Sequence, residues 1–303
     1  MPNNTWFTPY KFPPSTCLSL GPSQGIVYEV SDEAVVKLPF QYPVARSPPT
    51  DETNEQLHMS LQSFALFKKE STFYTILAKS PHPNLAQRLQ TKLLTGIVLP
   101  RYKLVEQVWG LHTTATHIAW IKQLVSAVVW LEDLGYTHGD INKRNMGIDD
   151  HNQLKLFDFG SVRHCDDEGF SEQVAEDQFT LATCIHYLAS GIDHVAKANS
   201  YAEVQRTISI LKGGQGIVDE AAKDFEEVIQ AGWTGAVSVL SSLKRRMAEI
   251  SNNAVAQHKD SLHEEQTKYD RLLVEEDSRW MNEEVYRAAW QAECYEIPDD
   301  IWS

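Results

Sequence analysis

Alternating apolar and polar positions near the amino terminus predict an antiparallel β-hairpin. Two runs rich in β-branched residues, 26–30 and 34–38, flank the polar turn Ser-Asp-Glu, and a glycine-containing turn precedes the first run. Short apolar stretches at 85–89 and 93–99 are typical of buried strands. Residues 41–56 lack periodicity and are rich in proline, threonine and acidic residues, which indicates a surface insertion.

Helical spacing of apolar residues dominates the rest of the chain. Residues 57–78 carry such a pattern, and the sequence Ser-Pro-His-Pro-Asn ends it. The segment 118–131 has a broad apolar face and is followed by Gly135, a C-cap candidate, and 177–191 is an apolar helix with a glycine stop. Residues 238–292 are almost free of glycine and proline, and their irregular apolar spacing predicts one long helix or a helical hairpin.

Composition and charge narrow the class of protein. A chain of 303 residues with 42% hydrophobic and 10% aromatic content is typical of a globular protein. With 41 acidic against 27 basic residues, the formal net charge is −14, and such a surface repels nucleic acid. No apolar run approaches the roughly 20 residues that span a bilayer. The four cysteines are far apart, so we expect a reducing intracellular location, cytoplasmic or nuclear, without a membrane or zinc partner.

The strongest candidate for chemistry is the sequence YTHGDINKRNMGI, residues 136–148. Asp140 and Asn145 are five residues apart in a loop after an apolar helix, and a later strand ends in the triplet Asp-Phe-Gly at 158–160. Phosphoryl transfer needs a carboxylate at the acceptor hydroxyl and hard oxygen ligands that hold Mg²⁺. Asp140 is suited to the first task, and Asn145 and Asp158 are suited to the second.

A cation that contacts the phosphates, held by an acidic residue, would complete this set. Lys37 stands at the end of the predicted hairpin, in the sequence Ala-Val-Val-Lys. Glu70 lies on the inner face of the helix predicted over 57–78 and is preferred as the partner of Lys37. The rival is Glu55, which falls in the proline-rich insertion.

With these residues in this order, the chain resembles the eukaryotic protein-kinase superfamily, and more closely the divergent kinase-like proteins of filamentous fungi. The resemblance covers about residues 18–191, with weaker similarity at 228–237. It implies a two-lobed α+β protein-kinase-like fold with a small β-rich N-lobe and a helical C-lobe. The expected divisions are an N-terminal extension at 1–17, an N-lobe at 18–102, a compact C-lobe at 103–235 and a helical extension at 236–303.

The resemblance also implies roles for the catalytic residues. Asp140 would be the catalytic base, Asn145 and Asp158 would bind the metal, and Lys37, oriented by Glu70, would pair with the α- and β-phosphates of ATP. Asp177, at the start of a large helix, would anchor the catalytic loop through backbone amides.

The adenine and phosphate contacts that the resemblance implies lie in the N-lobe. Gly21 and Gly25 would form the turn over the phosphates, and Val27 would cap the adenine. Leu99 would be the gatekeeper of a hinge that ends at Tyr102. This glycine loop is one residue shorter than the usual motif.

Three further departures at single positions affect the expected function. Gly139 replaces an arginine that meets an activation-loop phosphate in many kinases, so activity independent of phosphorylation between residues 158 and 177 is expected. Asn142 replaces a lysine that contacts the γ-phosphate, and Arg144 is the compensating cation, with Lys143 less well placed. Gly147 stands where a leucine usually forms the floor of the adenine site.

Only 16 residues separate Gly160 from Asp177, about half of what kinases use for a peptide-docking platform. The leading interpretation is transfer of the ATP γ-phosphate to a protein Ser/Thr hydroxyl, with Mg²⁺. The alternatives are a small-molecule kinase of the aminoglycoside-phosphotransferase type, and a pseudokinase or nucleotide-binding interaction module.

For the C-terminal helix the alternatives are a seam for self-association, a partner-binding arm and a cover of its own domain, anchored by Trp280, Trp290 and Trp302.

Two other motifs are interpreted as ordinary loops. The glycine-rich sequence at 211–224 is preceded by no strand and followed by no Lys-Ser/Thr pair, so it predicts a loop before a helix. The polar run 164–167, His-Cys-Asp-Asp, is interpreted as a solvated loop in preference to a metal cluster.

Overall fold

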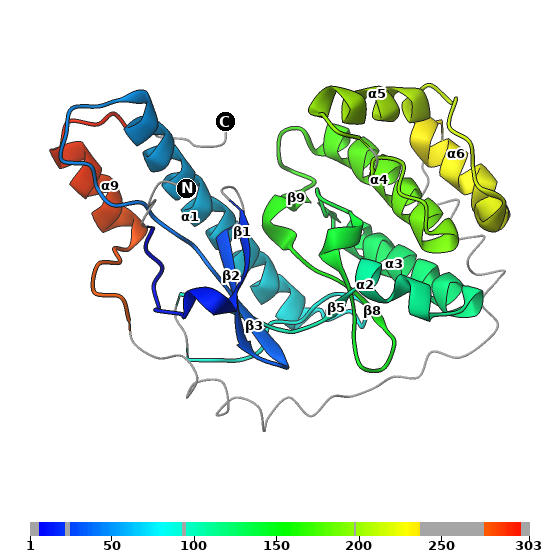
Figure 1. The fold of residues 1–303 in the computed structure, drawn as a ribbon, viewed down its shortest axis with the longest axis horizontal. Helices are drawn as coiled ribbons and strands as arrows, with labels where there is room; N and C mark the ends of the chain where they lie inside the picture. Colours follow the sequence, from blue (N-terminus) through cyan, green and yellow to red (C-terminus); the bar gives the residue numbers. More distant parts are fainter. Residues whose placement is uncertain (1–5, 22–24, 93–94, 197, 237–275, 298–303) are drawn as a thin grey trace. The chain divides into compact units, whose positions relative to one another are not determined.

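The computed structural model describes residues 6–21, 25–92, 95–196, 198–236 and 276–297, drawn in colour in Figure 1. These residues fall into two compact units. The first unit takes its described residues from 1–80, 87–101 and 259–303, and the second from 81–86 and 102–258. The first unit is a sheet with helices and the second is mainly helical, so the α+β class with an N-terminal β-sheet and a helical region is confirmed.

An antiparallel four-stranded sheet forms the centre of the first unit. Its order is β1-β2-β3-β4, with β1 at Cys17–Gly21, β2 at Gly25–Ser31, β3 at Ala34–Leu38 and β4 at Ile97–Pro100. The predicted hairpin is therefore confirmed as β2 and β3. Strand β1 was not predicted, because its alternation is short and begins at a cysteine.

The two later strand predictions have different outcomes. Residues 95–96 are not in a strand, and β4 begins only at Ile97; residues 93–94 lie outside the described part. The strand predicted at 85–89 is wrong: Leu85 makes only an isolated bridge to Leu156. Leu85 and Leu89 are buried, at 1% and 6% exposed, so their apolar character reflects burial of an irregular segment.

Helix α1 spans Asp51–Lys79 and is longer than its apolar pattern predicts. Thr50 and Thr53 form a reciprocal capping box, and Asp51 and Glu52 place negative charge on the first turn, where the helix dipole favours it. The predicted surface insertion is therefore wrong from residue 51 onward. The prolines just before Thr50 and the acidic residues just after it lie at the amino-terminal end of α1.

The described C-terminal segment belongs to the first unit. Helix α9, Glu283–Ala292, lies against the first half of α1 in Figure 1. Trp290 is fully buried in a cluster with Leu57 and Leu61 of α1, which confirms it as an anchor, and Trp280 packs at the edge of that cluster. Most of the predicted long helix, with Trp302, lies outside the described residues. Within 276–297, the helix has only ten residues.

The second unit contains two small sheets and a group of helices. Residues 103–104 (β5), 146–148 (β7) and 154–156 (β8) form an antiparallel sheet, and 136–137 (β6) pairs with 163–164 (β9). The helices are α2 (Val105–Val108), α3 (Thr114–Asp133), α4 (Phe170–Ser190), α5 (Tyr201–Lys212) and α6 (Glu226–Thr234).

Three sequence predictions on this unit can be compared with its elements. Helix α3 contains the predicted segment 118–131, and the chain leaves it through Gly135, whose φ is +79°. Helix α4 ends at Gly191 as predicted but begins seven residues before Asp177. Residues 213–219 form a loop between α5 and the 3-10 helix Glu220–Phe225, which confirms that the glycine-rich motif is a loop. None of the described helices is long and apolar enough to cross a membrane.

A buried histidine joins α4 to the rest of the helical core. His186 has no exposed surface, its ring lies 4.5 Å from that of His194 between centroids with a tilt of 34°, and Trp233 lies beside both rings. Nε2 of His186 accepts the backbone N–H of Asp219. Burial and, to a smaller extent, the neighbouring His194 lower the pKa of His186 to about 4, against smaller opposing effects of Ile192 and Asp219.

This lowered pKa predicts a loss of stability in mild acid. Between pH 6.5 and pH 4 the unfolded chain binds a proton that folded His186 does not, so stability falls as the pH falls. By pH 5 the loss from this group is about 2 kcal/mol. In urea unfolding at pH 7 and pH 5, His186→Gln should reduce the pH dependence, whereas His151→Gln, at an exposed site, should leave it intact. An unchanged dependence in His186→Gln would contradict the assignment.

Candidate active site

The first unit buries an ion pair between β3 and α1. Lys37 Nζ lies 2.6 Å from Glu70 Oε2, and the two side chains are 8% and 1% exposed. Glu55, the rival partner, is exposed on the second turn of α1. The predicted choice of Glu70 is therefore confirmed. Two opposite charges inside a low-dielectric interior attract strongly, but each has lost its hydration, so the arrangement is stable only while both partners are present.

The glycines assigned to nucleotide binding lie at the end of the same sheet. Gly21 and Gly25 are paired across β1 and β2, and residues 22–24 lie outside the described part. Gly25 has φ +87°, and a Cβ there would come within 2.6 Å of the Leu38 carbonyl oxygen, so this position requires glycine. Val27 pairs with Lys37 on the neighbouring strand. Its side chain is thus in register with the buried cation.

The residues assigned to the hinge are divided between the two units. Leu99 pairs with Val35 in the sheet and is 7% exposed. Tyr102 belongs to the second unit, where its ring stacks beside Phe157 at 6.2 Å between centroids. A Cβ on Gly147 would clash with Tyr102, so the backbone of β7 approaches this side chain more closely than a leucine would permit.

In the second unit, two asparagines hold the carboxylate of Asp140. Asn142 Nδ2 donates to Asp140 Oδ1 over 2.7 Å, and Asn145 Nδ2 donates to Oδ2 over 2.9 Å. Both amides also bond to the Asp140 carbonyl oxygen. The carboxylate therefore has a fixed orientation. Sequence reasoning treated Asn142 only as a missing lysine, although asparagine's tendency to bond within its own turn was a usable signal.

Asp177 anchors the backbone that precedes Asp140. Its Oδ2 accepts the N–H of His138 over 2.6 Å and its Oδ1 accepts the N–H of Gly139 over 2.9 Å. The anchoring expected from the resemblance is present, but Asp177 lies inside α4 and not at its start. Burial raises the pKa of Asp177 to about 6, against the lowering effect of the two N–H donors.

Gly139 permits close contact between the catalytic loop and the segment after Asp158. Its φ is +82°, and a Cβ would overlap the Ser161 carbonyl group. A side chain at this position would push the two backbones apart. An arginine here is therefore incompatible with this packing.

His138 and Phe159 are packing residues, as the resemblance implied. Both are fully buried, with ring centroids 5.3 Å apart. His138 Nδ1 accepts the N–H of Asp140, so its Nε2 carries the proton toward the Phe157 carbonyl oxygen. Burial lowers the pKa of His138. Asp158 follows Phe157 with φ +66°, a strained backbone for a non-glycine residue and one that clusters at functional sites.

The two cations of the loop have different surroundings. Lys143 Nζ is 3.1 Å from Glu106 and 3.0 Å from Asp193, and it lies over the Tyr187 ring. Arg144 is exposed, and its side chain forms no ion pair with any residue that the structure describes. Lys143 is thus occupied by structural ion pairs, whereas the guanidinium of Arg144 faces solvent.

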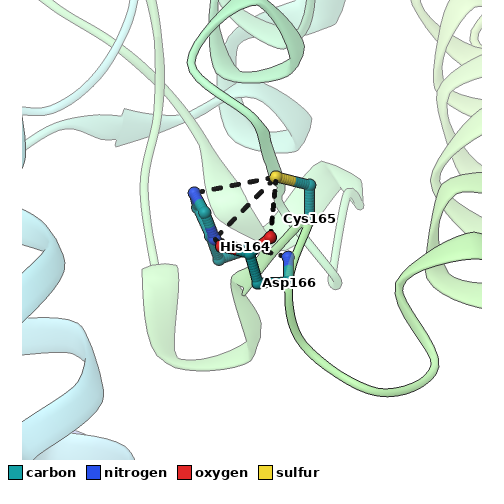
Figure 2. A group of neighbouring side chains, drawn as sticks. All are labelled: His164, Cys165 and Asp166. Carbon is teal, nitrogen blue, oxygen red and sulfur yellow. Dashed lines mark hydrogen bonds and ion pairs between the residues drawn. The ribbon is translucent and has the colours of Figure 1, made fainter.

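The polar run after Asp158 forms a compact turn. Figure 2 shows the side chains of His164, Cys165 and Asp166 close to one another; Cys165 and Asp166 are exposed and His164 is half-buried. Cys165 Sγ is 3.8 Å from both ring nitrogens of His164. Nδ1 also accepts the Asp166 N–H. The possible ligand atoms of the three residues lie within 4.8 Å of one another, an arrangement that could hold a metal ion, so the interpretation of 164–167 as a solvated loop stays a prediction.

A comparison with protein families matches part of the chain. Residues 56–191 match the family model described as protein tyrosine and serine/threonine kinase. The match includes Glu70 on α1, the loop with Asp140 and Asn145, and Asp158. Lys37 and the first three strands precede the matched segment, so their assignment rests on the ion pair and on sequence order.

The buried ion pair predicts strong coupling between its partners. Lys37→Met should destabilise the first unit by about 3–5 kcal/mol, because it leaves a buried carboxylate without its cation. Glu70→Met should have a similar effect. In urea unfolding, the double variant should be less destabilised than Lys37→Met alone, since both charges are absent. Additive losses would show that the two side chains act independently.

Proposed function

Because residues 56–191 match a model of the protein tyrosine and serine/threonine kinase family, we propose that the chain is an ATP- and Mg²⁺-dependent phosphotransferase acting on a protein Ser/Thr hydroxyl. The observation that carries this proposal is the buried Lys37–Glu70 ion pair. Burying two charges is costly, and a core of similar volume can be built from apolar residues. In kinases such a pair holds the lysine on the phosphates of ATP.

The second unit would supply the base and the metal ligands. Asp140, with both carboxylate oxygens held by amides, would accept the proton of the acceptor hydroxyl while the hydroxyl oxygen attacks the γ-phosphorus, the bond from that phosphorus to the β-phosphate oxygen breaks and ADP leaves. Asn145 uses its nitrogen to hold Asp140, so its Oδ1 is the atom suited to a hard cation. Asp158 would be the second ligand. The metal would neutralise charge that develops on the transferred phosphoryl group.

Several finer assignments belong to the same proposal. Gly21, Gly25 and Val27 would cover the nucleotide, and Leu99 and Tyr102 would contact adenine. We also propose the divisions at 18–102 and 103–235 as the functional lobes, membership of the divergent fungal kinase-like group, and an intracellular location. Activity independent of phosphorylation is part of the proposal, since Gly139 offers no side chain to a phosphate.

A second candidate acceptor is a small molecule that carries a hydroxyl group. The observation that favours it is the short segment between residues 161 and 169. Its strand β9 pairs with β6, Arg163 donates to the Glu168 carbonyl oxygen, and α4 begins at Phe170. This segment is bound to the catalytic loop, and few residues remain to form a platform for an extended peptide.

Turnover of ATP by the wild type beside Asp158→Ala tests the function. The wild type should hydrolyse ATP or autophosphorylate with Mg²⁺. The ATP turnover rate of Asp158→Ala should be at least about 100-fold lower, because this variant lacks a metal ligand. Asp150→Ala, on an exposed carboxylate, is the matched control and should retain full turnover. Protein mixtures and small hydroxyl compounds as acceptors separate the two candidates. If wild type and Asp158→Ala both lack turnover yet bind ATP equally without Mg²⁺, the chain is a pseudokinase.

The different surroundings of Lys143 and Arg144 give a second prediction. Arg144→Ala should lower kcat by about 10–100-fold, the effect of one charge-assisted contact to phosphate. Lys143→Ala should reduce stability through Glu106 and Asp193 but lower kcat much less. Arg144→Lys keeps the charge and should restore part of the rate. Equal losses of kcat in both alanine variants would show that the exposed guanidinium is not the compensating cation.

A further inference from the structure

Two buried serines tie helix α1 to the chain that follows β3. The backbone N–H of Phe40 donates to Ser63 Oγ over 3.1 Å, and that of Tyr42 donates to Ser60 Oγ over 2.9 Å. Both serines are at most 1% exposed. Residues 40–42 are thus joined to α1 by backbone donors, which leaves little freedom for the helix to slide.

The two serine bonds and the Lys37–Glu70 ion pair occur at matching intervals along α1 and along the chain that continues from β3. From Glu70 back to Ser63 the helix rises about 10.5 Å over seven residues, and from Lys37 to Phe40 an extended chain advances about 10 Å. Seven residues also return to nearly the same helix face. The ion pair and the two serine bonds therefore all join residues 37–42 to residues 60–70 of α1, which run antiparallel. A shift of α1 along its axis would break all three contacts together.

Tyr286 of α9, near the other end of the sequence, contacts both of these antiparallel segments. Its hydroxyl can donate to the Tyr42 carbonyl oxygen at 2.8 Å or to Ser60 Oγ at 3.0 Å. The side chain is 1% exposed, and burial raises its pKa to about 12, so the hydroxyl keeps its proton. One hydroxyl thus contacts both sides of the alignment, the extended chain and the helix.

The segment that carries Tyr286 is held at other points, so it can act as a fixed support. The N–H of Asp277 donates to the Pro9 carbonyl oxygen, and Arg279 lies over the Phe7 ring. Tyr295, beyond α9, bonds through its hydroxyl to the Ser47 carbonyl oxygen and to Thr53 Oγ1. These contacts do not depend on the Tyr286 hydroxyl.

We propose that Tyr286 is a positioning residue for phosphoryl transfer: through Ser60 and Tyr42 it keeps α1 in the register in which Glu70 meets Lys37. The catalytic part of this inference rests on the proposed function. The structural part does not, because the register of α1 can be measured without turnover. Tyr286 acts through α1 and does not contact the nucleotide.

Hydrogen exchange of the full chain, followed by mass spectrometry, tests the register. Tyr286→Phe removes the hydroxyl and keeps the ring, and amides at 64–72 should exchange at least about fivefold faster. Tyr295→Phe is the matched control, since it removes a tyrosine hydroxyl that also bonds to α1, but 17 residues before Glu70. Exchange at 64–72 should not change in this control. Ser60→Ala, which removes the partner on the helix, should reproduce the effect of Tyr286→Phe.

Kinetics provides the readout that general destabilisation would not produce. Tyr286→Phe should raise KM for ATP severalfold with a smaller change in kcat, and it should have no further effect in a Glu70→Gln background. The proposal is overturned if exchange at 64–72 is unchanged in Tyr286→Phe and Ser60→Ala, or if Tyr295→Phe accelerates that exchange as much as Tyr286→Phe does. It is also overturned if Tyr286→Phe raises KM for ATP as much in the Glu70→Gln background as in the wild type. Faster exchange in a chain with no ATP turnover would uphold the positioning of α1 and refute the proposed function.

Discussion

The first unit is organised around one buried ion pair. Lys37 and Glu70 are both nearly inaccessible to solvent, and neither can be charged there without the other. The pair forms only if a strand and a helix separated by a long connection meet in a single register. The capping box at Thr50, the two buried serines and the cluster around α9 all restrict that register.

A different constraint shapes the second unit. The loop that carries Asp140 has an irregular backbone, so its N–H groups cannot donate to the carbonyl oxygens of a regular helix or sheet and need other acceptors. Asp177 accepts two of them, and His138 accepts that of Asp140. Asn142 and Asn145 then fix the carboxylate of Asp140 itself. The geometry proposed for catalysis thus follows from satisfying buried polar groups.

The sequence predicted what depended on local pattern and on motif order. The β2–β3 hairpin and the choice of Glu70 were predicted from periodicity and from motif order, whereas the backbone bonds of Asp177 were expected only from the resemblance. The start of α1 at Asp51 was missed, since proline and acidic residues serve both loops and helix N-termini. The ion pairs of Lys143 join residues far apart in the chain, which one sequence cannot reveal.

The most direct test of the central claim is a crystal structure of the chain with Mg²⁺ and a non-hydrolysable ATP analogue. The claim is that the buried lysine of the first unit and the asparagine and aspartate of the second act on one nucleotide. The predicted result is that Lys37 Nζ contacts the α- and β-phosphates while Asn145 Oδ1 and the Asp158 carboxylate bind Mg²⁺. A nucleotide whose phosphates bind away from Lys37, or a metal held without Asn145 and Asp158, would contradict it.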